Sequence, residues 1–229
     1  MNWLVNFLTS SIGRKLVMSL TGLFLCFYLI IHVGGNLQLF LDDDGKAFNT
    51  YAHFMTSNPL ITVVAWGTKI AILLHAIVGI LLYFKNKAAR KVGYAVNNKK
   101  ASTWASRNMA LLGSITLAFI LVHLQNFWWQ IHNPNAIPPT MTVEGHEIPD
   151  LYQIVGSAFE QEWLVGLYVI SMVVLAYHLI HGFNSAFQSL GLNHKKYASL
   201  LKFLSIGVFG IIIPLLFAAM PIFFYLKAI

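Results

Sequence analysis

The sequence predicts an all-α integral membrane protein, a bundle of five transmembrane helices that forms one domain over residues 1–229. Of its 229 residues 57% are hydrophobic and 10% charged, which leaves too few polar side chains to cover a water-soluble globule. The apolar residues gather in five long runs. Basic and acidic residues lie in alternate connections between those runs.

Each apolar run is long enough, at about 1.5 Å per residue, to cross a hydrocarbon core of about 30 Å. Backbone polar groups inside a bilayer must bond to one another, so each run is expected to be a helix. Pro214 and Pro221 are expected to kink the last helix rather than end it. The expected spans are residues 15–41, 59–84, 107–131, 163–188 and 201–226.

The other segments are shorter. Residues 1–13 have apolar side chains at helical spacing, which predicts a short helix in the membrane interface. Residues 132–160 contain four prolines and predict an ordered cap or a flexible loop, with a short helix at residues 150–159. We expect no internal sequence repeat. The spaced apolar residues of the first segment are Trp3, Leu4, Phe7 and Leu8.

The distribution of charge predicts the orientation of the chain. Basic connections stay cytoplasmic, so we expect the N-terminus inside and the C-terminus, after five crossings, outside. The same rule accounts for the net charge of +7, and no nucleic-acid partner is expected because no base-reading motif is present. The basic residues of the expected inner side are Arg14, Lys15, Lys85, Lys87, Arg90, Lys91, Lys99, Lys100, Arg107, Lys195, Lys196 and Lys202.

The single cysteine, Cys26, lies within the first run. It makes no internal disulfide, and the sequence has no Cys-x-x-Cys-His motif that would attach heme covalently. The first run is longer than a signal-peptide core and has no cleavage site behind it, so we expect it to be retained. Any heme would therefore be held without a covalent bond.

Four of the five runs contain a histidine, and such a side chain is costly at membrane depth and marks a functional site by default. Heme iron, a proton path and an ordinary hydrogen bond are the possible partners. Each histidine lies 16 or 17 residues after the charge or proline where its helix begins, about 24–26 Å along the helix. His32 and His123 therefore share the expected outer level, and His75 and His178 share the inner level, about 10–15 Å away.

Two imidazoles that face each other across a bundle are the axial ligands that bis-histidine heme requires. Structural zinc fits less well, because it takes four ligands and neither level completes such a set. His181 is also expected to face inward, but His178 matches the depth and the His-x-x-x-Gly spacing and is the preferred ligand. The glycines expected to make room for a flat macrocycle are Gly34, Gly35, Gly79 and Gly182.

Over nearly the full length, the chain resembles a known family. The stretches SSIGRKLVMSLTGLFLCFYLIIHVGGNL, FNTYAHFM and YHLIHGF resemble the single-chain diheme cytochrome b anchor of succinate:quinone oxidoreductase and fumarate reductase, the succinate dehydrogenase cytochrome b558 type. The resemblance implies that electrons pass from a flavoprotein subunit through an iron–sulfur subunit to two b hemes in this chain, and then to quinone, with menaquinone expected. It implies that His75 and His178 bind the proximal heme near the cytoplasm, and His32 and His123 the distal heme near the outer face.

The resemblance also implies a place in the bacterial cytoplasmic membrane, as the quinone-reacting subunit of respiratory complex II. FAD and iron–sulfur clusters are expected on the partner subunits only, because this chain has neither a Gly-x-Gly-x-x-Gly fingerprint after a strand nor clustered cysteines. The basic inner loops are the expected docking surface, and a higher oligomer of the complex is a further expectation. Ala176 stands where some fumarate reductases carry a glutamate, so no transmembrane proton path of that kind is expected.

In similar proteins quinone is reduced near the distal heme, where polar groups hold its carbonyls and deliver protons. His53 is our first choice, as a titratable group just outside the second run, and Gln125 and Asn36 are the next. Lys46 and Lys227 are the cations noted on the outer side, so the distal propionates are expected to rely on neutral donors or water. Further polar candidates at the outer helix ends are Gln38, Tyr51, Asn126 and Trp129.

Two other functions remain open. Cytochrome b anchors of hydrogenases and formate dehydrogenases also place bis-histidine heme between helices. A proton-coupled transporter would use the histidines as a proton relay, although the lack of Asp or Glu within any run argues against it. The sequence leaves the direction of the reaction undecided.

Overall fold

The computed structural model describes residues 2–89 and 103–229. Within them, five helices are long and apolar enough to cross a membrane, which indicates a multi-pass membrane protein. The predicted inner-side residues Arg90, Lys91, Lys99 and Lys100 lie outside the described residues. The five spans match the five predicted runs and are Ser11–Phe40, Pro59–Ala88, Met109–His132, Glu162–Ser189 and Lys195–Ala228.

Polar side chains set the helix starts in the first half of the chain. Ser10 separates two helices, and its hydroxyl accepts a hydrogen bond from the backbone N–H of Gly13 at 3.0 Å, which caps the first span. Asn58 caps the second span in the same way, ahead of a proline at its first position. The elements are α1 (Asn2–Thr9), α2 (Ser11–Asn36), the 3-10 turn η1 (Leu37–Phe40), α3 (Lys46–Ser57) and α4 (Pro59–Ala88).

In the second half, two spans contain wider, π-helical turns. One follows His123 directly, and the other precedes Pro214, whose ring nitrogen has no hydrogen to donate. The last span continues through both prolines, as predicted. The elements are α5 (Trp104–Arg107), α6 (Met109–His123), η2 (Leu124–Trp128), α7 (Trp129–His132), α8 (Leu151–Phe159), α9 (Glu162–Ser189), η3 (Lys195–Tyr197), α10 (Ala198–Lys202), η4 (Phe203–Ile212) and α11 (Ile213–Ala228).

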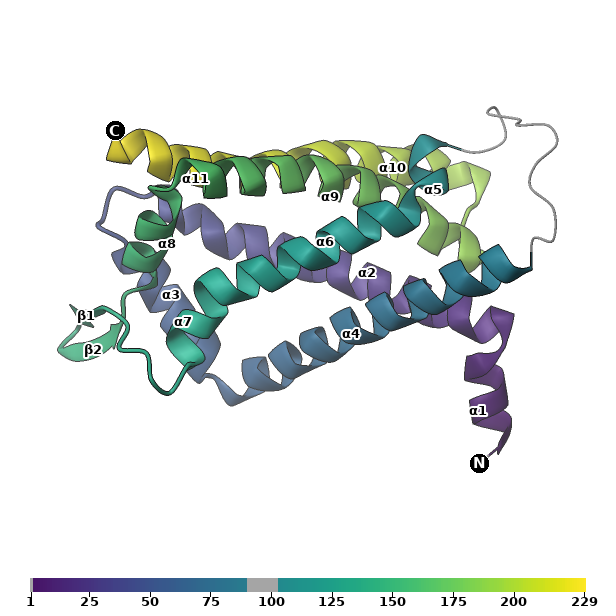
Figure 1. Ribbon diagram of the computed structural model, residues 1–229, viewed down its shortest axis with the longest axis horizontal. Helices are drawn as coiled ribbons and strands as arrows, with labels where there is room; N and C mark the ends of the chain where they lie inside the picture. The colour runs from purple at the N-terminus through teal and green to yellow at the C-terminus, as the bar shows by residue number, and fades with distance from the viewer. Residues whose placement is uncertain (1, 90–102) are drawn as a thin grey trace.

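Four spans form a ring in the order α2, α4, α6, α9, and α11 packs outside it against α9 and α2. Figure 1 shows the spans running along one long axis, with the two chain termini at opposite ends. We call the end that carries α3, α8 and the C-terminus the cap end. Because α2 and α6 are not neighbours in this ring, and neither are α4 and α9, residues from those pairs meet across the middle of the bundle.

The structure is mostly helical, as predicted, and a small β-hairpin at the cap end is an addition that the sequence did not predict. Strands β1 (Thr140–Val143) and β2 (His146–Pro149) pair antiparallel, with Val143 opposite His146. The two residues between them, Glu144 and Gly145, have positive φ values of 51° and 82°, the conformation that joins tightly twisted strands. The following segment forms the predicted short helix, α8, so the long connection is an ordered cap.

Asn49 of α3 holds the cap together from a position that is only 1% exposed. Its amide nitrogen donates to a carboxylate oxygen of Asp150 and to the sulfur of Met141, each at 2.8 Å. Its amide oxygen accepts from the backbone N–H of Tyr152 at 3.0 Å. One side chain thus joins α3, the hairpin and the start of α8.

Replacing Asn49 with leucine is expected to loosen this cap, because it leaves the backbone N–H of Tyr152 without its partner and removes one of the two hydrogen bonds that Oδ1 of Asp150 accepts. The local free energy of opening should fall by about 1–3 kcal/mol. Hydrogen–deuterium exchange of the α8 amides measures this change. The control is Thr56→Ala, at an exposed position on the same helix, and equal protection in the two variants would contradict the role of Asn49.

Candidate cofactor sites between the helices

The four histidines meet in two pairs at the centre of the bundle. The rings of His32 on α2 and His123 on α6 have centroids 5.9 Å apart with an interplanar angle of 89°. Those of His75 on α4 and His178 on α9 are 6.3 Å apart at 66°. These are the pairs that the sequence spacing predicts, and each joins two opposite helices of the ring. Their role as heme ligands stays a prediction.

These separations are on the scale of a pair that shares one metal ion. A bond from a metal to an imidazole nitrogen is about 2 Å long, so two such nitrogens on opposite sides of one ion lie about 4 Å apart, and the ring centres lie farther. The described residues contain no group of three or more His, Cys, Asp or Glu side chains able to hold a metal by themselves. A cofactor that brings its own equatorial ligands fits a two-histidine site better than a bare ion does.

One hydrogen bond of His75, to the Thr21 hydroxyl, indicates which of its ring nitrogens is protonated. The Thr21 hydroxyl donates to the Val17 carbonyl oxygen at 2.7 Å, so its one hydrogen is already used. Its oxygen lies 3.0 Å from Nδ1 of His75 and therefore accepts the hydrogen of Nδ1. The lone pair of His75 is left on Nε2, the arrangement that second-shell partners give to metal-binding histidines.

Two buried ring nitrogens have no hydrogen-bond partner among the described residues, Nδ1 of His123 and Nδ1 of His178. Buried polar atoms are nearly always satisfied, so such exceptions are a reason to look for an absent group. One belongs to each pair. His181 makes no ring contact with His75, whose ring partner is His178.

Glycines lie beside the imidazoles of the His75–His178 pair. A Cβ added to Gly22 would lie 3.2 Å from Cε1 of His75, and one added to Gly113 would lie 3.6 Å from Cε1 of His178. Gly34, by contrast, faces open space, as no atom lies within 4 Å of an added Cβ. Larger residues at Gly22 or Gly113 would occupy the volume next to the rings.

The other predicted macrocycle glycines differ among themselves. Gly79 and Gly182 have only a methionine methyl near an added Cβ, Met18 at 3.6 Å and Met109 at 4.0 Å. Gly35 does not fit the prediction, because its missing side chain is replaced by the ring of Tyr51. It serves close packing at the cap end instead.

Aromatic rings enclose the His32–His123 pair. Tyr28 stacks on His32 with centroids 5.3 Å apart, and Phe217 of α11 lies 5.5 Å from the same ring. Phe127 and Phe119 lie 5.3 and 5.9 Å from His123. This level is therefore a dry, aromatic environment, unlike the glycine-lined level of the other pair.

The expectation of no internal repeat needs a correction, because opposite helices of the ring share the same spacing of a few residue types. Both α2 and α6 have the pattern Met-x3-Gly-x5-aromatic-x3-His, and both α4 and α9 have a buried hydroxyl residue seven positions before a His-x3-Gly. The residues are Met18, Gly22, Tyr28 and His32, then Met109, Gly113, Phe119 and His123; and Thr68, His75 and Gly79, then Ser171, His178 and Gly182. The segments α2–α4 and α6–α9 thus share the same residue spacing, and each carries one histidine of each pair.

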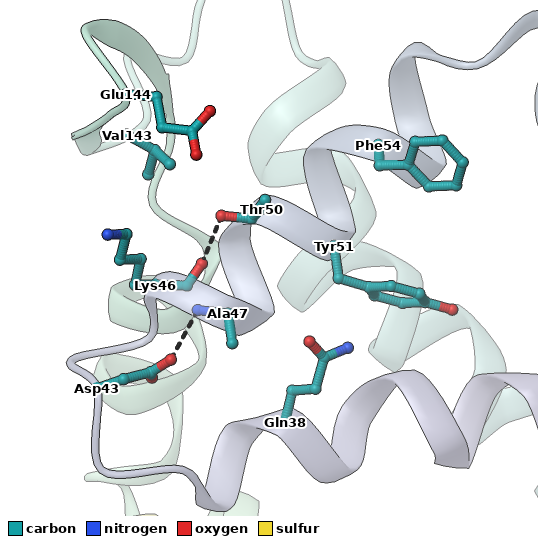
Figure 2. A pocket seen from close by; sticks show the side chains of 9 residues that line it. All are labelled: Gln38, Asp43, Lys46, Ala47, Thr50, Tyr51, Phe54, Val143 and Glu144. Carbon is teal, nitrogen blue, oxygen red and sulfur yellow. Dashed lines mark hydrogen bonds between the residues drawn. The ribbon is translucent and has the colours of Figure 1, made fainter.

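Two open pockets lie toward the cap end. One, of about 360 Å³, is a groove along η2 and the start of α7, lined by Leu124, Gln125, Trp128 and Trp129. The other, of about 670 Å³, lies between α3, η1 and the hairpin, and includes Gln38 and Tyr51. Figure 2 shows that in this second pocket Asp43 accepts a hydrogen bond from the Ala47 amide, so its carboxylate caps α3.

The predicted quinone-binding residues are therefore separated. Gln125 lines the η2 groove, together with Trp129. The Asn36 side chain donates to the His32 carbonyl oxygen at 2.7 Å and lies 3.4 Å from that histidine's Nδ1. His53 is exposed on α3 and lines neither pocket. Their roles toward quinone stay predictions.

Lys69 is a basic residue that the sequence analysis passed over. It lies within the second span, and its ammonium lies 4.4 Å from the ring centroid of Trp66 and 4.8 Å from that of Trp128. The signal was the lone charge in PLITVVAWGTKIAILL, an apolar stretch where a charge is costly.

No protein-family model, curated protein or solved structure matches this chain. The proposal of a function therefore rests on the residues, on their geometry and on the resemblance of the sequence described above.

Gly113→Leu is expected to reduce heme bound per polypeptide by about half, because the leucine side chain would occupy the volume beside His178. Heme extracted from the purified protein and quantified against polypeptide measures the loss. Gly166→Leu is the matched control, since an added Cβ at Gly166 meets no atom within 4 Å. Full heme content in the Gly113 variant would contradict the expected place of a heme beside Gly113 and His178.

Proposed function

We propose that this chain is the membrane-anchor cytochrome b subunit of a succinate:quinone oxidoreductase. It would carry electrons from an iron–sulfur partner subunit through two b hemes to membrane quinone. The observation that supports the proposal most is the meeting of four intramembrane histidines as two pairs on opposite helices, at two levels. The resemblance of the sequence to diheme anchors supplies the choice of partner subunits.

His75 and His178 would hold one heme, and His32 and His123 the other. Bound heme iron supplies reversible one-electron transfer, and the protein sets its position and polarity. Thr21 fixes the tautomer of His75 through the 3.0 Å hydrogen bond to Nδ1, so that Nε2 is available as a ligand. Tyr28 and Phe127 keep water from the second level by packing against its two imidazoles.

The charge pattern supports an orientation with the cap end outside the cytoplasm. Arg14, Lys15 and Lys85 lie at the opposite end, where basic residues favour the cytoplasmic side. The flavoprotein and iron–sulfur subunits would dock there, next to the His75–His178 level. In this orientation His32 and His123 form the level nearer the outer face, as in the family that the sequence resembles.

The η2 groove is the better of the two pockets for the quinone head group. It follows His123 directly along the chain, and its lining is apolar and aromatic apart from Gln125. The larger pocket contains the charged side chains of Asp43, Lys46 and Glu144, which suit water better than a lipid-soluble ring. His53 is retained as a candidate proton donor on the outer surface.

A reduced-minus-oxidised visible spectrum of the purified complex tests the proposal, with succinate as the reductant. We expect two b-type α-band components to be reduced. A colourless protein would instead favour a histidine-based transporter. Heme that succinate does not reduce, in a complex that contains nickel or molybdenum, would indicate the anchor of a hydrogenase or a formate dehydrogenase.

Thr21→Val is expected to weaken heme binding at the His75–His178 level by about 10–100-fold, the usual effect of removing a partner of a metal-bound histidine. Heme titration of the apoprotein measures the affinity. Thr116→Val is the control, because within residues 2–89 and 103–229 the Thr116 hydroxyl bonds only to the Leu112 carbonyl oxygen of its own helix. Equal affinities in the two variants would contradict the tautomer assignment.

A further inference from the structure

Lys69 carries a charge deep in the second span and has no anionic partner in the part of the chain that the structure describes. It lies ten residues after Pro59, about 15 Å along α4, too far for its side chain to bring the ammonium fully to the membrane surface. Its contacts among the described residues are the two indole faces, and none is a carboxylate. Cation–π contacts offset part of the cost of a buried ammonium, but they leave its hydrogen-bond donors unused.

The direction of the side chain places the ammonium beside the η2 groove. Trp128, on which the ammonium lies, also lines that groove, and Trp66 is three residues before Lys69 on the same helix. Lys69 and His75 are six residues apart, about 120° around the helix, so Lys69 points sideways toward α6 rather than to the bundle axis. The groove thus has a cation on its α4 side and the Gln125 amide on its α6 side.

We propose that Lys69 binds a carbonyl oxygen of the quinone head group in the η2 groove, an inference that rests on the proposed function. A quinone ring is flat and apolar and carries two carbonyl acceptors, which matches a groove of two tryptophans, one ammonium and one amide. Lysine has three rotatable donors on a flexible stem, so the ammonium reaches the groove with little movement.

The reduction of quinone balances in electrons and protons without any covalent change in Lys69. Reduction of quinone to quinol takes two electrons, which the outer heme level would supply, and two protons, which water at the cap end supplies. Negative charge develops on the carbonyl oxygens as the electrons arrive. The ammonium stabilises that charge in a medium of low polarity, where a charged hydrogen bond is strong.

The test compares three variants of the whole purified complex, with a short-chain naphthoquinone as electron acceptor. Lys69→Gln should lower kcat/KM at least about tenfold, the factor expected for the loss of one charged hydrogen bond, through a higher KM from the lost contact with the carbonyl and a lower kcat from the lost stabilisation of charge. Lys69→Arg keeps the charge and should restore most of the rate. Lys46→Gln, the same substitution at an exposed lysine of the cap end, should match the wild type.

Each other outcome overturns the inference. Unchanged kcat/KM in a heme-loaded Lys69→Gln complex would exclude quinone binding by Lys69. A shifted heme midpoint potential with unchanged KM would assign the ammonium to a heme propionate, and loss of a co-purified anionic phospholipid with unchanged KM would assign it to a lipid.

Failure of the proposed function gives a different result. A wild-type complex without heme would refute that function, whereas the binding of the naphthoquinone, measured by calorimetry on wild type and Lys69→Gln, still tests Lys69. Equal affinities in that titration would overturn the inference independently of electron transfer.

Discussion

The two pairs of opposite helices in the four-helix ring, α2 with α6 and α4 with α9, face each other across the same central axis. This constraint organises the molecule. Residues from α2 and α6 can meet at the centre only at a height where residues from α4 and α9 do not. Antiparallel neighbours provide the two heights, because histidines at similar distances from the start of each helix fall alternately near one end and the other. The pairs His32–His123 and His75–His178 are the result.

Much of this arrangement was predictable from the sequence because a bilayer restricts both helix length and polarity. The spans and the two histidine pairs follow from apolar runs and from counting residues along each run. The hairpin around Glu144 was not predicted, since Glu rarely adopts positive φ and the strands are short. Gly22 was not predicted because its position beside His75 depends on a neighbouring helix. Lys69 was not predicted because its contact with Trp128 also joins two different spans.

The two levels differ in what surrounds the imidazoles. Glycines lie next to His75 and His178, and the Thr21 oxygen lies 3.0 Å from Nδ1 of His75. Rings of tyrosine and phenylalanine enclose His32 and His123, and the π-helical turn that follows His123 forms the groove next to Lys69. A similar pair of imidazoles thus has a more polar environment at one level and an aromatic environment next to a groove at the other.

The matching residue spacing of α2–α4 and α6–α9 has a consequence for assembly. The α2–α4 segment supplies one histidine to each of the two pairs, and the α6–α9 segment supplies the other. Both pairs therefore form only when α2 packs opposite α6 and α4 opposite α9, so the two segments must come together before either pair exists. The two segments are not identical, because Lys69 lies six residues before His75 and Met172 lies six residues before His178.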